Sequence, residues 1–392
     1  MKTALQNGRI ITPEGILENK TLLLEDGVIL GLEEPNVKLP SDTKLLDCSG
    51  AYVSPGFLDL HLHGGGGHDY MDGTVEAIEE ASRTHLKHGT TSLCPTTLTS
   101  TDEDLFSFFE MYRTAKEDMQ DGPELLGIHL EGPYFSPEQR GAQDPKYLRK
   151  PTKEHWTSIL SSSPDIVRMS LAPELEGALE LGRELEKRGI VAAIGHSNAN
   201  YKECRKAVEA GFRHVTHLYS GMSTIHRKNA YRVLGVVESA YLLDELSVEI
   251  IADGCHLPPE LLEYIVRFKD SSKISLITDS SRGATMPEGS KILLGSLKNG
   301  QECYVENGVA IMPDRTCFAG SVCTTDRCVR TMWKKVGVSL ETAVSMMSYH
   351  PAKVLGLEKH KGLLQKGYDA DIVVFDDYIN ILHALVGGLI RF

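Results

Sequence analysis

Residues 55–63 read Pro-Gly-Phe-Leu-Asp-Leu-His-Leu-His, an apolar run that ends in two histidines. Such a run is typical of a buried strand, in which successive side chains point to opposite faces. His61 and His63 are two residues apart, so both rings lie on the same side, with Cα atoms roughly 6–7 Å apart. This spacing lets both rings reach one metal ion at roughly 2.0–2.1 Å.

Further apolar or β-branched runs follow this strand, and helical patterns separate them. We predict strands at 56–61, 90–95, 126–130, 167–171, 190–194, 214–216, 247–251 and 274–278, with helices such as 75–88, 175–188 and 258–269. This alternation is the signature of βαβ units and a parallel sheet. It fits a closed (β/α)8 barrel of the TIM type better than an open sheet.

The two ends of the chain have a different pattern, in which short apolar runs alternate with turn signals. Glu25-Asp26-Gly27 separates two such runs near the start, and Gly367–Asp371 precedes the run Ile372–Phe375 near the end. Asp-Gly between apolar runs indicates a hairpin. We therefore predict an α/β protein with two domains: a small β-sandwich from residues 1–54 and 362–392, and a barrel from 55–361.

Composition excludes several classes of protein. The 392 residues include 41 basic and 54 acidic ones, a formal charge of −13, which argues against a nucleic-acid partner. No apolar run reaches the roughly 20 residues of a membrane span, and the first residues lack the apolar core of a secretory signal. The eight cysteines form no Cys-x-x-Cys pair, so we expect free thiols rather than a disulfide framework or a zinc knuckle. A cytoplasmic location is expected.

Metal-ligating side chains also follow other predicted strands of the barrel. Glu131, His196, His217 and Asp279 each stand at a strand's carboxyl end. These ends converge on one mouth, where barrel enzymes place their chemistry. A single histidine there is usually structural, but several together with two buried carboxylates indicate a metal, since burying those carboxylates unpaired costs several kcal/mol each. The mixed N/O set suits Zn, Fe, Mn or Ni, with one or two ions per chain.

A metal at a barrel mouth with a carboxylate beside it favours hydrolysis. The ion would lower the pKa of a bound water towards roughly 7 and polarise a substrate carbonyl. Asp279 could take the proton from that water and pass it to a departing amine. The alternative for Asp279 is a plain helix N-cap before Ser280 and Ser281.

Longer motifs carry a resemblance to a known family. They are PGFLDLHLHGGGGHDYMDG (55–73), HGTTSLCPTTLTS (88–100), GIHLEGPY (127–134), IGHSNA (194–199), THLYSGM (216–222), ADGCH (252–256), ITDS (277–280) and AGS (319–321). In this order the chain resembles the N-acetylglucosamine-6-phosphate deacetylase family of the amidohydrolase superfamily. The resemblance implies a barrel beside a small β-sandwich, a homodimer, and removal of acetate from N-acetylglucosamine 6-phosphate.

The resemblance also implies roles for the ligands. Glu131, His196 and His217 would hold the principal metal, with Asp279 as general base and acid. A second metal could join His61, His63, Glu131 and Asp279. Strand 167–171 carries no lysine, so the carboxylated lysine that bridges metals in many relatives is absent, and Glu131 is the expected bridge.

Positions that hold the sugar phosphate in the family can be carried over with three departures. The expected substrate-binding residues are Ala142, Gln143, Ser220, Gly221, Arg227, Asp253, Gly254, Cys255, His256, Phe318, Ala319 and Gly320. Gln143 stands where the family has a histidine that contacts the amide oxygen, and Ser220 replaces an asparagine. Arg282 adds a charge that we expect near the mouth. Arg227 would bind phosphate through its planar fork, although a solvated surface arginine is the alternative.

Four glycines, Gly64–Gly67, follow His63. They lead into no Lys-Ser or Lys-Thr, so a P-loop is excluded and a flexible loop over the site is expected. The predicted activity is deacetylation of N-acetylglucosamine 6-phosphate. Because of the departures, another N-acyl sugar, including N-acetylgalactosamine 6-phosphate or an unphosphorylated amide, stays open as the substrate. A barrel that has lost catalysis is the alternative from another class.

Overall fold

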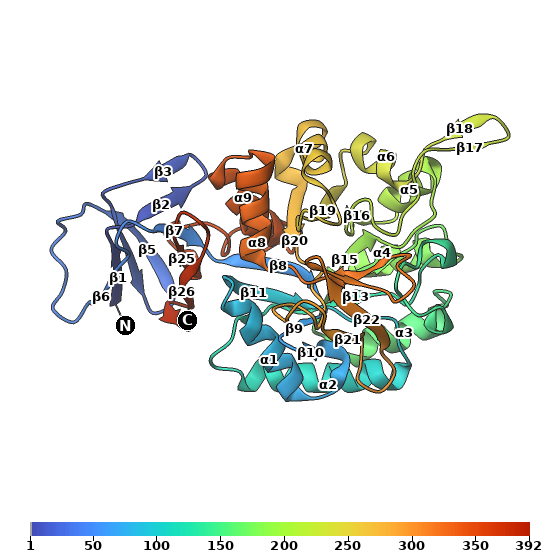
Figure 1. Ribbon diagram of the computed structural model, residues 1–392, viewed down its shortest axis with the longest axis horizontal. Helices are drawn as coiled ribbons and strands as arrows, with labels where there is room; N and C mark the ends of the chain where they lie inside the picture. The colour runs from blue at the N-terminus through green and yellow to red at the C-terminus, as the bar shows by residue number, and fades with distance from the viewer. Residues whose placement is uncertain (1) are drawn as a thin grey trace.

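The computed structural model describes residues 2–392, and its central element is a curled parallel sheet (Figure 1). Within these residues eight barrel strands follow one another: β8 (Phe57–Leu62), β11 (Thr90–Pro95), β13 (Ile128–Glu131), β14 (Ile166–Leu171), β15 (Val191–Ile194), β16 (Phe212–Val215), β19 (Ser247–Ile251) and β20 (Ile274–Ile277). Neighbours pair in parallel from β8 to β11 and from β13 to β20. Parallel bridges Thr96–His129 and Leu62–Ser280 close the ring. The predicted TIM-type barrel is confirmed.

Helices surround this barrel. They are α1 (Val75–Leu86), α2 (Asp102–Asp118), α3 (Lys153–Ser162), α4 (Ala178–Lys187), α5 (Tyr201–Glu209), α6 (Val236–Leu242), α7 (Pro259–Phe268), α8 (Thr325–Arg330), α9 (Leu340–Met347) and α10 (Tyr349–Val354). The main hydrophobic core lies between their apolar faces and the strands. Helix α4 begins three residues later than predicted because Gly177 before it is left-handed, at φ 91°.

Strands from both ends of the chain build a second domain beside the barrel (Figure 1). One sheet has the order β5 (Val28–Glu33), β4 (Thr21–Glu25), β1 (Lys2–Gln6), β6 (Lys44–Asp47). The other has the order β27 (Leu389–Ile390), β26 (Ile381–Val386), β25 (Ile372–Phe375), β7 (Tyr52–Pro55), β2 (Arg9–Thr12), β3 (Gly15–Leu17). Apolar side chains from both sheets form a separate core. The predicted β-domain of joined termini is confirmed, whereas its residue limits stay a prediction.

Four additional strands form a sheet that the sequence analysis did not anticipate. They are β21 (Lys291–Leu294), β22 (Gln301–Glu306), β23 (Val309–Ile311) and β24 (Phe318–Ser321), joined in antiparallel order. This sheet follows β20 and has its own small apolar core. The turn between β23 and β24 contributes to the wall of the cavity described below. Smaller pieces are β9 (Gly64–Gly65), β10 (His68–Asp69), β12 (Glu124–Leu125) and the hairpin β17 (His226–Lys228) and β18 (Tyr231–Val233).

All eight cysteines are free thiols, as predicted. Among residues 2–392, no helix has the length and apolarity that crossing a membrane requires.

Candidate metal centre

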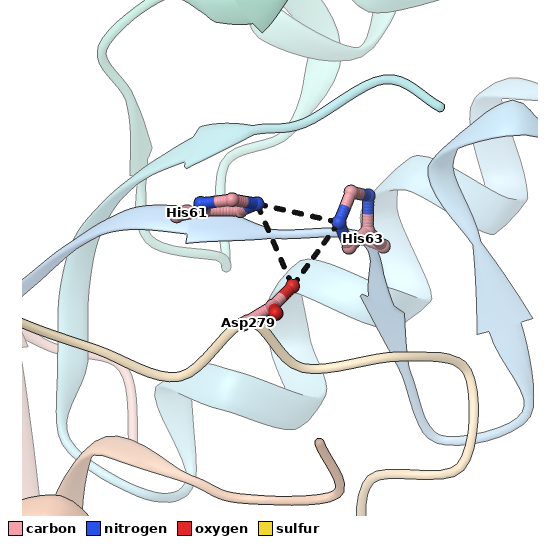
Figure 2. Close-up of side chains that lie close together, drawn as sticks. All are labelled: His61, His63 and Asp279. Carbon is pink, nitrogen blue, oxygen red and sulfur yellow. Dashed lines mark hydrogen bonds and ion pairs between the residues drawn. The ribbon is translucent and has the colours of Figure 1, made fainter. Parts of the chain in front are cut away.

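Six side chains at the carboxyl ends of the barrel strands gather into two buried groups. His61 and His63 from β8 meet Asp279, which follows β20 (Figure 2). Glu131, His196 and His217 form the second group. In each group the potential ligand atoms lie within 4.8 Å of one another. These residues, predicted from five separate segments, are therefore brought together at one mouth.

Short distances join the nitrogen and oxygen atoms within each group. His63 Nε2 lies 3.2 Å from Asp279 Oδ1 and 3.3 Å from His61 Nε2. In the second group, Glu131 Oε1 lies 3.0 Å from His217 Nε2 and 3.3 Å from His196 Nε2. Each group can therefore offer nitrogen and oxygen to one ion.

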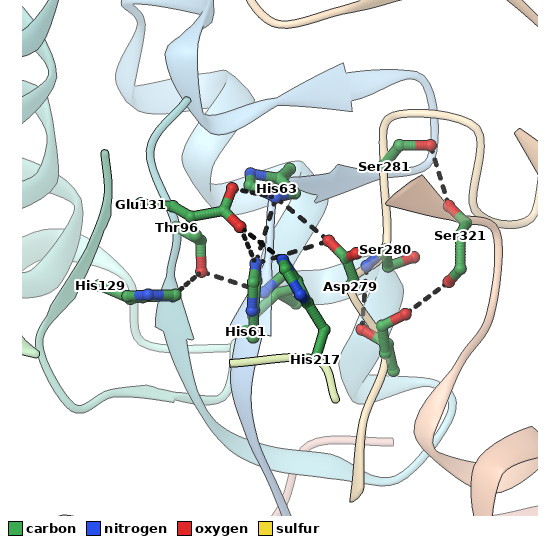
Figure 3. Close-up of polar contacts among 12 residues, drawn as sticks. His61, His63, Thr96, His129, Glu131, His217, Asp279, Ser280, Ser281 and Ser321 are labelled. Atoms are coloured by element: carbon green, nitrogen blue, oxygen red, sulfur yellow. Dashed lines mark hydrogen bonds and ion pairs between the residues drawn. The ribbon is translucent and has the colours of Figure 1, made fainter. Parts of the chain in front are cut away.

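Glu131 faces both groups (Figure 3). Its Oε1 lies 3.4 Å from His61 Nε2, and its Oε2 lies 3.4 Å from His63 Nε2. One carboxylate thus stands between the two sets of ligands, in the position expected of a bridge. The two buried groups are consistent with the binuclear metal site that is typical of amidohydrolases.

Three of these residues have an uncommon backbone conformation. His196, His217 and Asp279 have positive φ angles of 45°, 28° and 48°. Residues other than glycine adopt this region at a cost of order 1–3 kcal/mol, and such strain clusters at functional sites. Each of the three stands two residues after the last residue of a barrel strand, so the turn redirects a side chain into the mouth.

The buried nitrogen atoms test whether these residues fit a metal. His196 Nδ1 lies 2.8 Å from the carbonyl oxygen of Gln139, and within residues 2–392 the Nδ1 atoms of His63 and His217 have no hydrogen-bond partner. The Nε2 atoms, by contrast, face one another and the carboxylates. Two Nε2 atoms at 3.2 Å cannot both act as donors, and a divalent ion between them satisfies both lone pairs. The donor set therefore fits a divalent ion.

The pKa shifts of the site residues also indicate a place for positive charge. Burial opposes ionisation of Glu131, yet the charge of His61 and hydrogen bonds from His196 and His217 hold its pKa well below the usual range. The pKa of Asp279 is lowered as well, against the effect of burial, by His61 and His63. Although burial disfavours the charged ring, the hydrogen bond to Asp279 and the nearby carboxylates raise the pKa of His63 to about 9. The pocket thus favours positive charge.

A cavity of about 360 Å³ opens above these residues. Of the predicted substrate-binding residues, seven line it: Ala142, Gln143, Ser220, Gly221, His256, Phe318 and Gly320. Seven further lining residues were missed: Leu98, Gly141, Leu294, Ile311, Arg315, Thr316 and Cys317. Most of the missed residues belong to the sheet of β21–β24 or its turn, which no sequence pattern had placed beside the barrel.

The other predicted substrate residues lie outside this lining. Asp253 is buried and its carboxylate accepts from His256 Nδ1 at 2.8 Å, so it orients the histidine that faces the cavity. Gly254 and Cys255 form the turn between them, and Ala319 packs in the core of the β21–β24 sheet. Arg227 is exposed on the β17–β18 hairpin, which projects from the barrel (Figure 1).

Gln143 has a different set of contacts from the one expected of an oxyanion donor. Its Nε2 donates to Glu131 Oε2 at 2.7 Å, and its Oε1 accepts from the backbone and hydroxyl of Thr99 at 3.0 and 2.8 Å. The amide lines the cavity and holds the candidate bridging carboxylate. Its second amide hydrogen is the one that a substrate oxygen could accept.

Arg282 does not add a charge to the mouth, contrary to expectation. Its side chain is 5% exposed and forms a bidentate pair with Asp72, at 2.8 and 2.6 Å. It also donates to the carbonyl oxygens of Gly67 and Gly295. Because the guanidinium is satisfied by these acceptors, it works as a buried clamp between the glycine segment and β21.

The glycine segment itself is not a free flexible loop. Gly64 and Gly65 form β9, which pairs with β10. Gly64 N donates to Ser280 O, and Gly66 N donates to Ala284 O. These bonds attach the segment to the chain after Asp279, so it forms a fixed wall beside the ligands.

Comparisons with known proteins agree with this geometry. The profile of the amidohydrolase family matches residues 52–389. An N-acetylglucosamine-6-phosphate deacetylase of Lysinibacillus sphaericus is 32% identical over 99% of this chain and 97% of its own. An N-acetylgalactosamine-6-phosphate deacetylase of Escherichia coli O157:H7 is 31% identical over 99% of both chains.

Solved structures show the same relationship. The N-acetylglucosamine-6-phosphate deacetylase of Pasteurella multocida aligns with a TM-score of 0.91 and 28% identity, covering 100% of this chain and 99% of its own. A mutant of the Mycobacterium smegmatis enzyme, solved in complex with N-acetyl-D-glucosamine-6-phosphate, aligns with a TM-score of 0.88, 28% identity and the same coverage. Fold and site therefore define a metal-dependent amidohydrolase. Within that class, the chain belongs to the N-acetylglucosamine-6-phosphate deacetylase family.

Proposed function

We propose that this protein hydrolyses the acetamido group of N-acetylglucosamine 6-phosphate to acetate and glucosamine 6-phosphate. The observation that carries the proposal is the pair of ligand groups, His61/His63/Asp279 and Glu131/His196/His217, below a cavity at the barrel mouth. The Mycobacterium smegmatis relative in complex with this sugar phosphate supports the choice of substrate.

Glu131, His196 and His217 would hold one ion, and His61, His63 and Asp279, with Glu131 as the bridge, a second. Zn, Fe, Mn or Ni suits this set of imidazole and carboxylate ligands. A divalent ion supplies acidification of a bound water and polarisation of the amide carbonyl. The remaining chemistry belongs to residues of the chain.

Asp279 is the proposed general base and acid. It lines the cavity and its lowered pKa keeps the carboxylate ionised, ready to accept a proton from water. As the water oxygen bonds to the acetyl carbon and the carbon–nitrogen bond breaks, the same proton passes from Asp279 to the amine. Gln143 is proposed to donate its free amide hydrogen to the carbonyl oxygen.

The wall of the cavity would position the sugar. His256 is fixed by Asp253 and packs on Phe318 with ring centroids 4.7 Å apart, which offers a flat edge to a hexose ring. Ser220 and Gly221 line the same cavity from the turn after His217. The proposed substrate contacts in this cavity are His256, Phe318, Ser220, Gly221, Ala142 and Gly320.

N-acetylgalactosamine 6-phosphate is the second candidate substrate. The relative from Escherichia coli O157:H7 bears the name of that activity and is 31% identical, almost the value of the Lysinibacillus sphaericus relative. The two sugars differ only at the hydroxyl of carbon 4.

Acetate release by metal-reconstituted protein tests the proposal. The panel contains N-acetylglucosamine, N-acetylgalactosamine and N-acetylmannosamine, each with and without the 6-phosphate. Preference for N-acetylglucosamine 6-phosphate supports the proposal, and preference for the galacto isomer supports the second candidate. Absence of release from metal-loaded protein would contradict both and revive a non-catalytic role.

Gln143→His and Gln143→Met refine the proposed role of the amide. If Gln143 donates to the oxyanion, Gln143→Met lowers kcat by roughly 100-fold, whereas Gln143→His retains activity. Equal loss in both variants would instead indicate that the contact of Gln143 with Glu131 dominates.

We also propose that the protein is a homodimer and that it lies in the cytoplasm. Arg227 and its hairpin project from the barrel, so contact between Arg227 and a phosphate in this chain's own cavity is not supported by the lining residues. Light scattering after size-exclusion chromatography tests the dimer. Comparison of Arg227→Met on phosphorylated and unphosphorylated sugars tests the arginine.

A further inference from the structure

A buried carboxylate, Glu249 of β19, lies directly beneath the candidate metal ligands. It is 0% exposed and does not line the cavity. Its Oε2 lies 3.4 Å from Nδ1 of His61 and accepts from the backbone N–H of His217 at 3.3 Å. Glu249 therefore contacts a ring of one ligand group and the backbone of the other.

The other oxygen of Glu249 has its own partners. Oε1 accepts a charge-assisted bond from Arg168 Nη1 and lies 3.4 Å from His214 Nε2. Arg168 is fully buried and also donates to Leu60 O at 3.1 Å, so it is anchored to β8. Because this pair occupies Oε1, the carboxylate is held with Oε2 towards His61 and is not itself placed among the metal ligands.

This contact gives Nδ1 of His61 a proton acceptor. A histidine that binds a metal through Nε2 carries its proton on Nδ1, and Glu249 is the acceptor that lies at that nitrogen. Nε2, which lies 3.4 Å from Glu131 and 3.5 Å from Asp279, then keeps its lone pair. His63, the other histidine of the same group, has no hydrogen-bond partner at Nδ1 among residues 2–392. Glu249 is therefore the acceptor that supports the His61 ring of this group.

We infer that Glu249 is a positioning residue: it holds His61 as the Nδ1–H tautomer and so sets the occupancy of the His61/His63/Asp279 metal position, with Arg168 as its anchor. This inference rests on the proposed metal centre. Loss of such outer contacts typically weakens metal binding by 10–100-fold.

Glutamine cannot replace this carboxylate, although it has nearly the same shape. If the amide oxygen stays with Arg168, the amide N–H₂ group points at His61 Nδ1 and at the N–H of His217. The opposite rotamer places the N–H₂ group against the donors of Arg168. Either arrangement brings donors together, and the first one forces the proton of His61 to Nε2.

Asp59 offers a matched control. It is equally buried and lies on β8, two residues before His61. Its carboxylate accepts from the backbone N–H of His61 at 3.2 Å and from Thr278 Oγ1 at 2.6 Å. Asp59→Asn therefore changes a buried carboxyl group next to the same ligands without placing a donor against the ring of His61.

Zinc binding by purified apoprotein tests the inference. Wild type, Glu249→Gln and Asp59→Asn are titrated with Zn²⁺, metal content is measured after dialysis, and the melting temperature of each apoprotein is recorded. After dialysis, we expect wild type and Asp59→Asn to retain two zinc ions and Glu249→Gln to retain one. In the titration, the second ion should bind to Glu249→Gln about 10–100-fold less tightly than to wild type. Two tightly held ions in Glu249→Gln, or the same loss in Asp59→Asn, would overturn the inference. Wild type that binds no zinc would instead overturn the proposed function.

A measurement on wild-type protein covers the case in which Glu249→Gln does not fold. Two-bond ¹H–¹⁵N correlation spectra of histidine-labelled apoprotein and of the zinc-loaded form distinguish the tautomers, and His61→Asn assigns the signal. A proton on Nδ1 of His61 supports the inference. A proton on Nε2 in the apoprotein contradicts it.

Discussion

Two clusters of acidic side chains in this protein differ in whether they contain their own cation. In the Lys361 cluster, Lys361 Nζ lies 2.6 Å from Glu124, 3.0 Å from Asp369 and 2.6 Å from Asp371. The mouth cluster consists of the six candidate metal ligands, and its two carboxylates, Glu131 and Asp279, face histidines. The oxygen atoms of the three acids of the Lys361 cluster lie within 4.8 Å of one another, close enough to hold a metal ion, yet the lysine ammonium already pairs with each of them.

The position of each cluster agrees with this difference. The Lys361 cluster joins β12, beside the barrel strand β11, to the segment that leads into β25 of the terminal domain. The mouth cluster lies below a cavity, and its strained residues turn their side chains towards it. A group of acids is therefore informative about metals only when the surrounding cations have been counted. The Lys361 cluster is therefore structural, whereas the mouth cluster can bind a metal ion.

The same substitution in both clusters gives the largest contrast. Asp279→Asn should lower kcat/KM for the best sugar phosphate by at least about 1000-fold, because it removes the proposed base and acid. Asp371→Asn should leave kcat/KM nearly unchanged, because Asp371 contacts Lys361 and the backbone of Gly387 instead. Acetate release measures both. A comparable loss in Asp371→Asn would erase the distinction between the clusters.

Removal of metal should act on the mouth cluster alone. Dialysis against a chelator should abolish acetate release and lower the melting temperature, since an ion at 100 times its Kd contributes about 2.7 kcal/mol to stability. Differential scanning calorimetry with and without Zn²⁺ measures this change. The same difference is expected in Lys361→Met, and a chelator effect that depends on Lys361 would contradict the assignment.

Loss of the internal cation should destabilise the Lys361 cluster. Lys361→Met leaves three carboxylates facing an apolar side chain, and breaking a buried ion pair costs roughly 3 kcal/mol. The lysine is 6% exposed, whereas Glu124 and Asp369 are half-exposed, which moderates the cost. Urea unfolding measures the change, and kcat of the remaining folded protein should equal that of wild type. An unchanged midpoint would show that water solvates these acids.

The smallest expected effect is a pH dependence of the stability that Lys361 contributes. Burial opposes the charged ammonium, yet Asp371 and Glu124 raise the pKa of Lys361 above its ordinary value. The unfolded lysine titrates near roughly 10.4, so its stabilisation is complete below that pH and is lost as pH rises through the folded pKa. The unfolding difference between wild type and Lys361→Met should therefore be constant from about pH 7 to 9 and shrink above about pH 10.4. A decline already below pH 9 would contradict this sign.

Local patterns predicted much of the architecture. Every predicted barrel strand has a counterpart, because buried parallel strands are written as continuous apolar runs. The strand predicted from residue 126 starts at Ile128, since Gly127 has φ 153°. The β21–β24 sheet was not predicted, because the local pattern of its short alternating strands does not indicate what they pack against.

By itself, the sequence determined the barrel, the β-domain of joined termini and the six residues that meet at the mouth. The barrel and the β-domain follow from local patterns of apolar runs and turn residues, and the six ligands stand at strand ends that parallel strands bring together. Only the tertiary structure decided that Arg282 is buried against Asp72, that the glycine segment is bonded to the chain after Asp279, and that Glu249 lies behind His61. These contacts join residues far apart in the chain, and a side chain's partner is set by packing in space, which no local spacing encodes.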